Sequence, residues 1–436
     1  MQNLSNLDDV DRREALRKIG LAAVAPVMAA AIINVRSPTT DDDATDYLQE
    51  AIDRCAAAGG GVVRINRPFI CRSARQVGEG TLASLIVWGD NVTLDFGEQG
   101  SIEFVYRDSQ RYRPIIVGGV GKAMNNRLTL HNSRCIDVPV TSLQGSLAKG
   151  SQEIHLPAGL SAKAGDVLFI RSGQLLASTK TEPDAELCVV KSVSERTATL
   201  MEPLAKGYTR HLRNWGGGPE ESLTQSSPYG LANVTNRVSR NIELRSPRMR
   251  CFSCLQLLSI WSVDGFRSIG GELSYNNLGV GARDARMVQW RTSLRHSGQV
   301  NGRSYAIAPS TGCTDWDVVW DVVSLGSNYL HIHEGVARSK FSGSLRMAGT
   351  DAASAGLSIV ARAYDIDISD VLIDTGTSQE GGVLVRGSYI ENVSFDRLTV
   401  RNNSIGTAAV RTDAISNVRF STAPNLIGRN KIIKQI

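Results

Sequence analysis

The sequence lacks the features that mark several large protein classes. It has no phosphate-binding loop, dinucleotide fingerprint, GxSxG elbow or HExxH zinc motif, which excludes the enzyme classes that depend on them. No apolar run is long enough to cross a membrane. The charge is also weak, because 48 basic and 43 acidic residues leave +5, which does not indicate binding to nucleic acid.

Cysteine is sparse as well. The seven cysteines are scattered and odd in number, so a disulfide framework is not expected in so long a chain. Cys251 and Cys254 have the spacing of metal ligands, but on a strand they would face opposite sides, and no second such pair exists. We predict that the cysteines are small core residues.

Aromatic residues make up only 6% of the chain, whereas glycine reaches 41 residues. This composition suits many short strands joined by tight turns.

Residues 1–31 are expected to be a leader and not part of the fold. Arg12 and Arg13 precede an apolar run that ends in small residues near Ala29–Ala31. This resembles a bacterial twin-arginine export signal, which implies an exported protein, periplasmic or extracellular. The alternative is a basic amphipathic N-terminal helix.

A helix and a glycine-rich turn are expected next. Ala44, Leu48, Ile52 and Cys55 recur at three- and four-residue steps and form one apolar helical face. Gly59–Gly61 then break the helix, and a strand begins. This resembles the N-terminal cap of the pectate-lyase-like right-handed parallel β-helix proteins, in which a short amphipathic helix covers the open end of the stacked coils. The resemblance implies an all-β fold of that class.

The rest of the chain supports this fold independently, because short alternating segments recur along it. We take the following residues as equivalent points: Ile242, Phe266, Met287, Trp316, Ser339, Ile366, Val393 and Val418. A unit of roughly 25 residues with loose length is typical of a solenoid. Within each segment the apolar period is two, which favours stacked parallel strands over helices.

These patterns divide the chain into parts. We expect the capping helix and first coils at 40–140 and the main parallel β-helix at 230–436. Between them, at 148–209, strands with their own turns break the period. That segment is similar to the small β-subdomain inserted in some phage and bacterial β-helix proteins.

Two histidines stand out in "YLHIHEG". His331 and His333 would point to the same side of a strand. They could be metal ligands, which would need a third ligand such as His296, or a surface pair, or an acid–base group. His333 and Glu334 match half of the Asp-Pro-His-Glu motif of alginate C5-epimerases, whereas His331 and Ile332 replace its Asp-Pro. We favour acid–base chemistry and expect no bound cofactor; no motif indicates calcium, and the sequence leaves open whether calcium assists.

Arginine dominates the basic residues of 237–436, with 20 arginines against three lysines. Guanidinium forks suit bidentate binding of carboxylates. The aligned strand ends predict a column along one edge of the coils: Arg283, Pro309, His333, Arg362, Arg386 and Arg411. Such a column suits an acidic polysaccharide. Alternatively, the arginines pair with Asp284, Asp365 and Asp413 at turns.

A second group lies upstream. Arg295 and His296 form a pair that resembles one in phage-tailspike-like β-helix proteins. Tyr305 and Tyr329 are expected close enough in the stack to act as a phenolic acid or as platforms for sugar rings.

Together these observations favour an exported lyase that cleaves an acidic, uronate-containing polysaccharide by β-elimination. The expected roles are a base at His333, a carboxylate-binding cation at Arg362 or Arg386, an acid at His296 or Tyr329, and a positioning group at Arg295. The other expected substrate-binding residues are Arg283, Arg411, His331, Glu334 and Tyr305.

Other activities on the same fold stay open. The motif sets of classical pectate lyases and of polygalacturonases are absent from this chain. A glycoside hydrolase would use Asp315, Asp317 or Asp321, a C5-epimerase would use the same base, and a non-catalytic surface protein would only bind glycan. The sequence also leaves open whether the chain forms a homo-oligomer.

Overall fold

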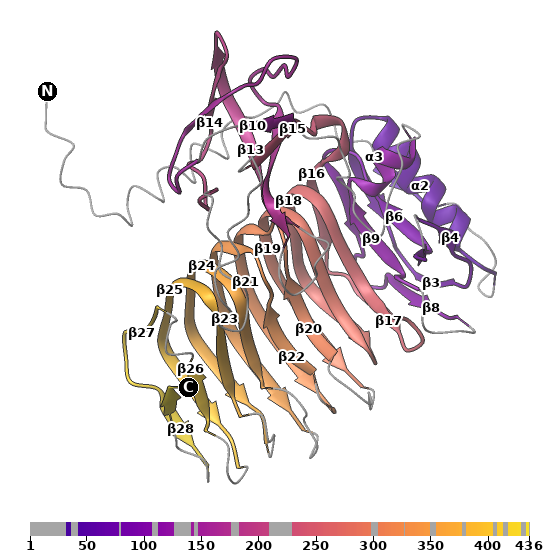
Figure 1. Cartoon of the computed structure of the whole chain (residues 1–436). Helices are drawn as coiled ribbons and strands as arrows, with labels where there is room; N and C mark the ends of the chain where they lie inside the picture. Colours follow the sequence, from indigo (N-terminus) through magenta and orange to yellow (C-terminus); the bar gives the residue numbers. More distant parts are fainter. Residues whose placement is uncertain are drawn as a thin grey trace, which may run out of the picture.

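The structure is a computed structural model, which describes these residues: 32–35, 42–77, 80–106, 112–125, 141–143, 147–175, 183–208, 229–297, 304–326, 328–348, 355–376, 381–403, 408–412, 417–428 and 433–435. The chain forms a right-handed parallel β-helix of about 11 turns (Figure 1). The predicted fold class, an all-β parallel β-helix with a capping helix and an inserted β-subdomain, is confirmed. The predicted export segment at 1–31 lies outside the described residues.

Each turn of the helix contributes strands to three faces. Face 1 contains β6 (Leu85–Val87), β9 (Ile115–Gly118), the first parts of β18 (Gln256–Tyr275) and β19 (Leu278–His296), β20 (Ser304–Pro309), β22 (Asn328–Ile332), the first parts of β24 (Leu357–Asp374) and β25 (Val383–Arg401), β26 (Val410–Thr412) and β29 (Ile433–Gln435).

Face 2 contains β1 (Ile32–Asn34), β2 (Gly61–Arg64), β7 (Val92–Asp95), β16 (Ser239–Arg245), the middle parts of β18, β19, β24 and β25, the first parts of β21 (Thr314–Ser324) and β23 (Val336–Met347), and β27 (Val418–Phe420). Face 3 contains β3 (Pro68–Cys71), β8 (Ser101–Phe104), β17 (Arg248–Cys251), the last parts of the long strands, and β28 (Asn425–Ile427).

The interior of the coil is one continuous apolar core. Alternate side chains of every face point inward, so aliphatic and aromatic residues of successive coils stack on one another, including the fully buried Trp290, Trp316 and Trp320. The six cysteines within the described part are buried and form no disulfide, as the sequence predicted.

Most of the predicted equivalent points pair in register. Ile242 pairs with Phe266, and Ser339, Ile366, Val393 and Val418 pair in succession. Met287 is the exception, because Val288 is the residue that pairs with Phe266 and Trp316. Met287 has a left-handed backbone (φ 56°), which turns its side chain outward and leaves it 49% exposed.

A left-handed backbone conformation recurs at the equivalent position on face 2 of other coils. The residue there is Asn241 (φ 52°), Gly265 (φ 85°) and Asp365 (φ 54°) in three of them. Glycine, asparagine and aspartate tolerate this conformation best. Methionine does so poorly, so sequence pattern alone did not reveal that coil's offset.

Helix α2 (Thr45–Ala57) closes the N-terminal end of the coil, as predicted. Its buried face packs on the first coils through Leu48, Ala51, Ile52 and Cys55. Asp43 holds its start: the Asp43 carboxylate accepts hydrogen bonds from the Thr45 N–H (3.0 Å), the Arg72 N–H (3.0 Å) and the Ser73 hydroxyl. The cap is thus tied to the turn after β3. A short hairpin of β4 (Arg75–Gln76) and β5 (Leu82–Ala83) follows.

The inserted β-subdomain lies in the chain between β9 and β16. Its six strands are β10 (Thr141–Leu143), β11 (Glu153–His155), β12 (Val167–Leu175), β13 (Pro183–Ser194), β14 (Thr197–Leu200) and β15 (Tyr229–Asn233). It therefore includes strands on both sides of the 148–209 segment. The helices α3 (Val120–Asn125) and η1 (Thr235–Arg237) lie at its two ends.

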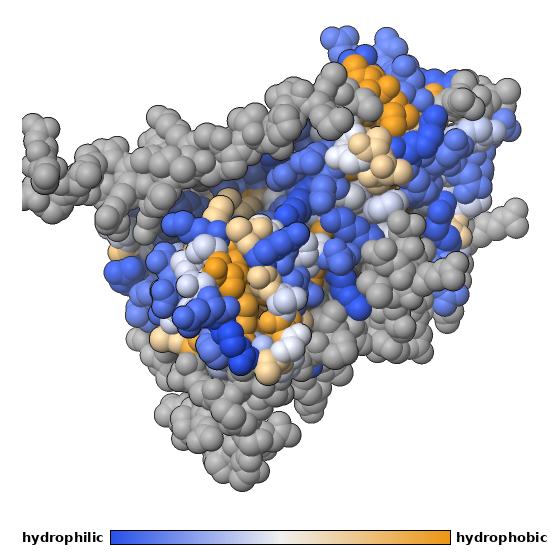
Figure 2. Space-filling view, turned by 90° about the horizontal axis from the view of Figure 1, so that it is seen from above, coloured by the Kyte–Doolittle hydropathy of each residue, from blue (hydrophilic) through white to orange (hydrophobic). Residues whose placement is uncertain are grey.

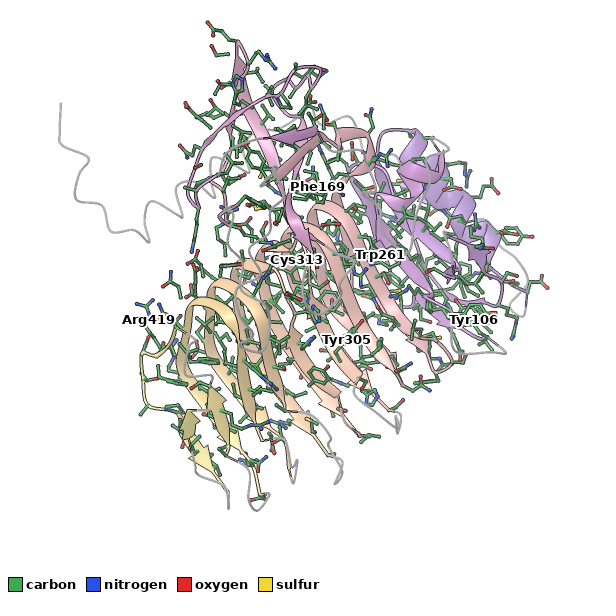
Figure 3. The ribbon with its side chains drawn as sticks, in the orientation of Figure 1. Tyr106, Phe169, Trp261, Tyr305, Cys313 and Arg419 are labelled. Carbon is green, nitrogen blue, oxygen red and sulfur yellow. The ribbon has the colours of Figure 1, made fainter. Side chains whose placement is uncertain are left out.

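The subdomain covers the outward side of the early coils on face 1. Phe169 and Leu187 from its strands share an apolar cluster with Ile86, Ile116 and Trp261, which point outward from β6, β9 and β18. Figure 3 shows Phe169 on the subdomain and Trp261 on the coil. Later coils of face 1 do not enter this cluster. Viewed from above, the described surface is mainly hydrophilic with small apolar patches (Figure 2).

None of the helices within the described ranges is long and apolar enough to cross a membrane.

The Asp43 contacts predict that the stabilisation of the helix α2 start depends on pH. Burial raises the pKa of Asp43, but the hydrogen bonds from Ser73, Thr45 and Arg72 outweigh it and lower the pKa to about 2. An unfolded aspartate has a pKa of about 3.9, so the stabilisation is complete above pH ~4 and is lost as the pH falls toward 2. We expect Asp43→Asn to lower the free energy of unfolding by about 1 kcal/mol at neutral pH. In urea titrations, the difference in free energy of unfolding between wild type and Asp43→Asn should disappear as the pH falls from ~4 to 2. A difference that stays constant over this range would contradict the prediction.

Candidate functional site

Three aromatic side chains, two on β22 and one directly after it, lie in a row on the outward side of face 1. Leu330 and Ile332 point into the core, so the alternating Tyr329, His331 and His333 point outward. The rings of Tyr329 and His331 are 5.1 Å apart and those of His331 and His333 are 4.8 Å apart, both edge to face. All three side chains are partly exposed. The sequence therefore predicted the common direction of His331 and His333 correctly.

Arginines occupy the same outward columns in other coils. His331 pairs with Ser358, Ser358 with Leu384, and Leu384 with Arg411. Arg411 thus lies in the column of His331, three coils away, or about 14 Å at ~4.8 Å per coil.

Arg386 belongs to the neighbouring column, that of His333. Ile332 pairs with Ile359, and Val360 pairs with Arg386, so His333 and Arg386 are two coils apart. In the other direction Ala282 pairs with Pro309, which places Arg283 two coils before His333. Arg283, His333 and Arg386 therefore align as predicted, whereas Arg411 lies in the adjacent column and Pro309 pairs with the core residue Ala282.

Arg362 does not lie in these columns, because Val336 pairs with Ala363 and Arg362 is therefore aligned with Gly335 and not with His333. Its guanidinium is instead buried at the corner between faces 1 and 2, where its Nε lies 3.8 Å from the Glu334 carboxylate. The two side chains are 5% and 1% exposed. This ion pair stabilises the corner next to His333, and it leaves Arg386 as the more accessible arginine.

The structure does not bring Arg295 and His296 to His333. Both residues end the face 3 part of β19. Arg295 pairs with Glu272 (3.2 Å) and Asp321 (2.8 Å), and buried His296 contacts the Ser324 hydroxyl (2.9 Å) and the Asn276 carbonyl (3.0 Å). Burial lowers the pKa of His296. A sugar bound on face 1 could not reach them.

The three aspartates considered for hydrolysis also lie away from the histidines. Asp315, Asp317 and Asp321 are on faces 2 and 3, and each is bound by an arginine: Arg338, Arg291 and Arg295 respectively.

The inserted subdomain fixes the loop that carries His333 and Glu334. Lys206, which is fully buried, donates hydrogen bonds to the Asp184 carboxylate (2.9 Å), the Ala185 carbonyl (2.6 Å) and the Gly335 carbonyl. Gly335 follows Glu334 directly and has φ 88°, which favours glycine. Sequence reasoning missed Lys206 because the insertion has no repeat to align it with.

Further polar contacts join the subdomain to the coils. Glu202 binds Arg286 (3.1 Å), and Lys149 binds Asp365 (2.8 Å). Arg338 donates to the Pro203 carbonyl. The subdomain is therefore docked along the corner between faces 1 and 2 over several coils.

Across the described ranges, no group of three histidine, cysteine, aspartate or glutamate side chains is arranged to hold a metal ion.

The Lys206 contacts predict that substituting this lysine strongly weakens the docking of the inserted subdomain on the coils. Lys206→Met would leave Asp184 buried without its cation, and we expect the free energy of unfolding to fall by about 3–5 kcal/mol. Lys149→Met is the matched control, because the Lys149 side chain is 33% exposed and should contribute about 1 kcal/mol or less. Urea midpoints and the rate of proteolysis within the insertion measure both effects. Equal shifts for the two variants would contradict the docking role.

The solved structures to which this chain is similar include phage tailspikes and an epimerase module. No protein-family model matches this chain, and no curated protein is similar to it. The tailspike protein gp49 from Pseudomonas phage LKA1 is 12% identical over 89% of this chain and 76% of that chain, with a TM-score of 0.42. The Gp54 tailspike of Acinetobacter baumannii bacteriophage AP22, in complex with a capsular saccharide, is 10% identical over 98% and 72%, with a TM-score of 0.36. The A-module of the Azotobacter vinelandii mannuronan C-5 epimerase AlgE6 is 14% identical over 92% and 98%, with a TM-score of 0.31. These likenesses concern the path of the chain and carry no inference about its chemistry.

Proposed function

We propose that this chain cleaves an acidic polysaccharide that lies along the outward side of face 1. The observation that carries the proposal is the row Tyr329–His331–His333, with arginines in the same outward columns on both sides of it. Aromatic rings supply platforms for sugar rings, guanidinium groups bind carboxylates, and histidine titrates near neutral pH.

The reaction that fits these groups is β-elimination from a uronate. A cation beside the sugar carboxylate makes the C5 proton more acidic. A base removes that proton, its electron pair forms the C4–C5 double bond, the C4–O bond breaks, and an acid protonates the leaving oxygen. Because the two reacting bonds are on neighbouring carbons, the base and the acid must be close together.

The ring distances suggest how the roles are divided. His333 is the proposed base, and His331, whose ring is 4.8 Å from that of His333, is the proposed acid. The Tyr329 ring is 5.1 Å from that of His331. Tyr329 would hold the His331 ring in place and stack on a sugar ring. Arg386, in the column of His333, is the proposed partner of the sugar carboxylate.

The histidine row predicts the effect of removing the base. Wild type incubated with uronate polymers should raise ultraviolet absorbance, because elimination creates an unsaturated sugar. His333→Ala should reduce this rate by roughly 10²- to 10⁴-fold. His155→Ala is the matched control, because His155 is exposed on β11 of the insertion, and it should leave the rate unchanged.

Three outcomes would overturn the lyase. New reducing ends without absorbance would show a hydrolase. Altered sugar composition without cleavage would show an epimerase, which removes the same proton and returns one to the opposite face. A polymer that stays unaltered, and that wild type and His333→Ala bind equally well, would show a non-catalytic binding protein.

A further inference from the structure

A second cluster lies on the outward side of face 1, where the inserted subdomain ends. Arg113, just before β9, donates through Nη1 to the Gln256 side-chain oxygen and to the Ser259 hydroxyl (3.4 Å). The Tyr305 hydroxyl donates to the same Gln256 oxygen (3.0 Å). Gln256 in turn donates to the Ser259 hydroxyl (2.9 Å). Four side chains thus form one hydrogen-bonded group, in which Tyr305 on β20 reaches across the β19 coil to Gln256 on β18.

The coil around this group is shaped to hold it. Gly281 lies beneath the Gln256 side chain, and a Cβ at Gly281 would come within 2.7 Å of the Gln256 amide nitrogen. The Arg113 guanidinium also lies over the Trp261 ring, 5.1 Å from its centre. Trp261 itself is clamped by the subdomain cluster that contains Phe169. Figure 3 shows Trp261 and Tyr305 on the coils below Phe169.

The charge of this group is unbalanced. Among the described residues, the hydrogen-bond partners of Arg113 are an amide and a hydroxyl, both neutral. Burial lowers the pKa of Arg113, and the nearby Arg283 lowers it further. Burial also raises the pKa of Tyr305, against the opposing influence of Arg113 and Arg283, so the phenol stays neutral and cannot be the counter-ion. A largely buried guanidinium whose described hydrogen-bond partners are neutral calls for an anion.

We infer that Arg113, with Arg283 and Tyr305, forms a subsite for the carboxylate of an acidic sugar. This inference rests on the proposed function, and it names a second contact point for the same polymer. Tyr305 pairs with Tyr329 in the next coil, so the subsite adjoins the histidine row. A polymer along the helix axis would place one uronate at the histidines and another uronate at Arg113. The flat guanidinium, already oriented by Trp261 and Gln256, suits bidentate carboxylate binding.

The test measures binding of a defined oligouronate and of its carboxyl-reduced, neutral counterpart by calorimetry. All proteins carry His333→Ala so that the ligand stays intact. Arg113→Met should weaken oligouronate binding at least tenfold and leave binding of the neutral sugar unchanged. Arg248→Met is the matched control, because Arg248 lies on face 3 and donates to backbone carbonyls. Equal oligouronate affinity in Arg113→Met and the control overturns the subsite.

A second variant guards against misfolding of Arg113→Met. Arg113→Lys keeps the charge and stem but loses the planar fork, so oligouronate affinity should fall several-fold. Oligouronate affinity equal to that of wild type overturns the subsite whether or not Arg113→Met folds.

The subsite and the proposed function can fail separately. Sodium glucuronate, compared with glucose, should raise the melting temperature of wild type more than that of Arg113→Lys. If this holds while no polymer is cut, the subsite stands and the lyase fails. If His333→Ala abolishes cleavage while the arginine variants bind oligouronate as wild type does, the lyase stands and the subsite fails.

Discussion

The regular stacking of parallel coils is the constraint on which the rest of the structure depends. Adjacent strands lie about 4.8 Å apart and side chains alternate between inside and outside, so each side chain has its nearest neighbours one coil above and below. On face 1, Val280, Ile307, Leu330 and Leu357 fill the inward positions. A slip of one residue would expose that row and bury the polar one, so the core determines which side chains face outward. The common direction of Tyr329, His331 and His333 is a consequence of the core.

The inserted subdomain turns this uniform stack into one with a distinct site. Its apolar contacts with Trp261 and Ile116 supply burial, but apolar contacts alone would tolerate many orientations. The buried Lys206 restricts the choice, because its ammonium is satisfied only when Asp184 and the Gly335 carbonyl meet there. Docking therefore covers the early coils of face 1 and leaves the later ones accessible. The Arg113 group lies where the cover ends, next to the histidine row.

The repeat made the fold predictable from sequence. Alternating apolar residues at intervals near 25 residues can bury a core only if the coils stack, so the pattern favoured stacked parallel strands and supported the β-helix that the resemblance of the N-terminal cap implied. The direction of the histidines followed from the same alternation. Register was harder to predict. The alignment failed at Met287, whose left-handed backbone offsets its coil, and at Pro309, Arg362 and Arg411, which lie outside the column of His333.

Residues outside the repeat could not be placed from sequence. Lys206 lies in the insertion, whose docking depends on contacts between segments far apart in the chain. Arg113 meets Gln256 across 143 positions, with the insertion between them. Arg295 and His296 were expected beside His333 because they lie near it in sequence, but the coil has three faces, and proximity in sequence does not determine the face. Only the structure assigns them to face 3.

The arginines show that residue type alone does not indicate function in this fold. On faces 2 and 3, arginines pair with acids of the adjacent coil: Arg291 with Asp317, Arg295 with Asp321, Arg338 with Asp315, and Arg401 with Asp374. These partly exposed pairs each stabilise the stack modestly and use the guanidinium within the protein. The register puts a carboxylate beside each of them. Beside Arg113 it puts an amide, a hydroxyl and an indole, and the nearby charge is another arginine. Arginine is therefore structural where an acid lies one coil away, and available to a ligand where, among the residues that the structure describes, its partners are neutral.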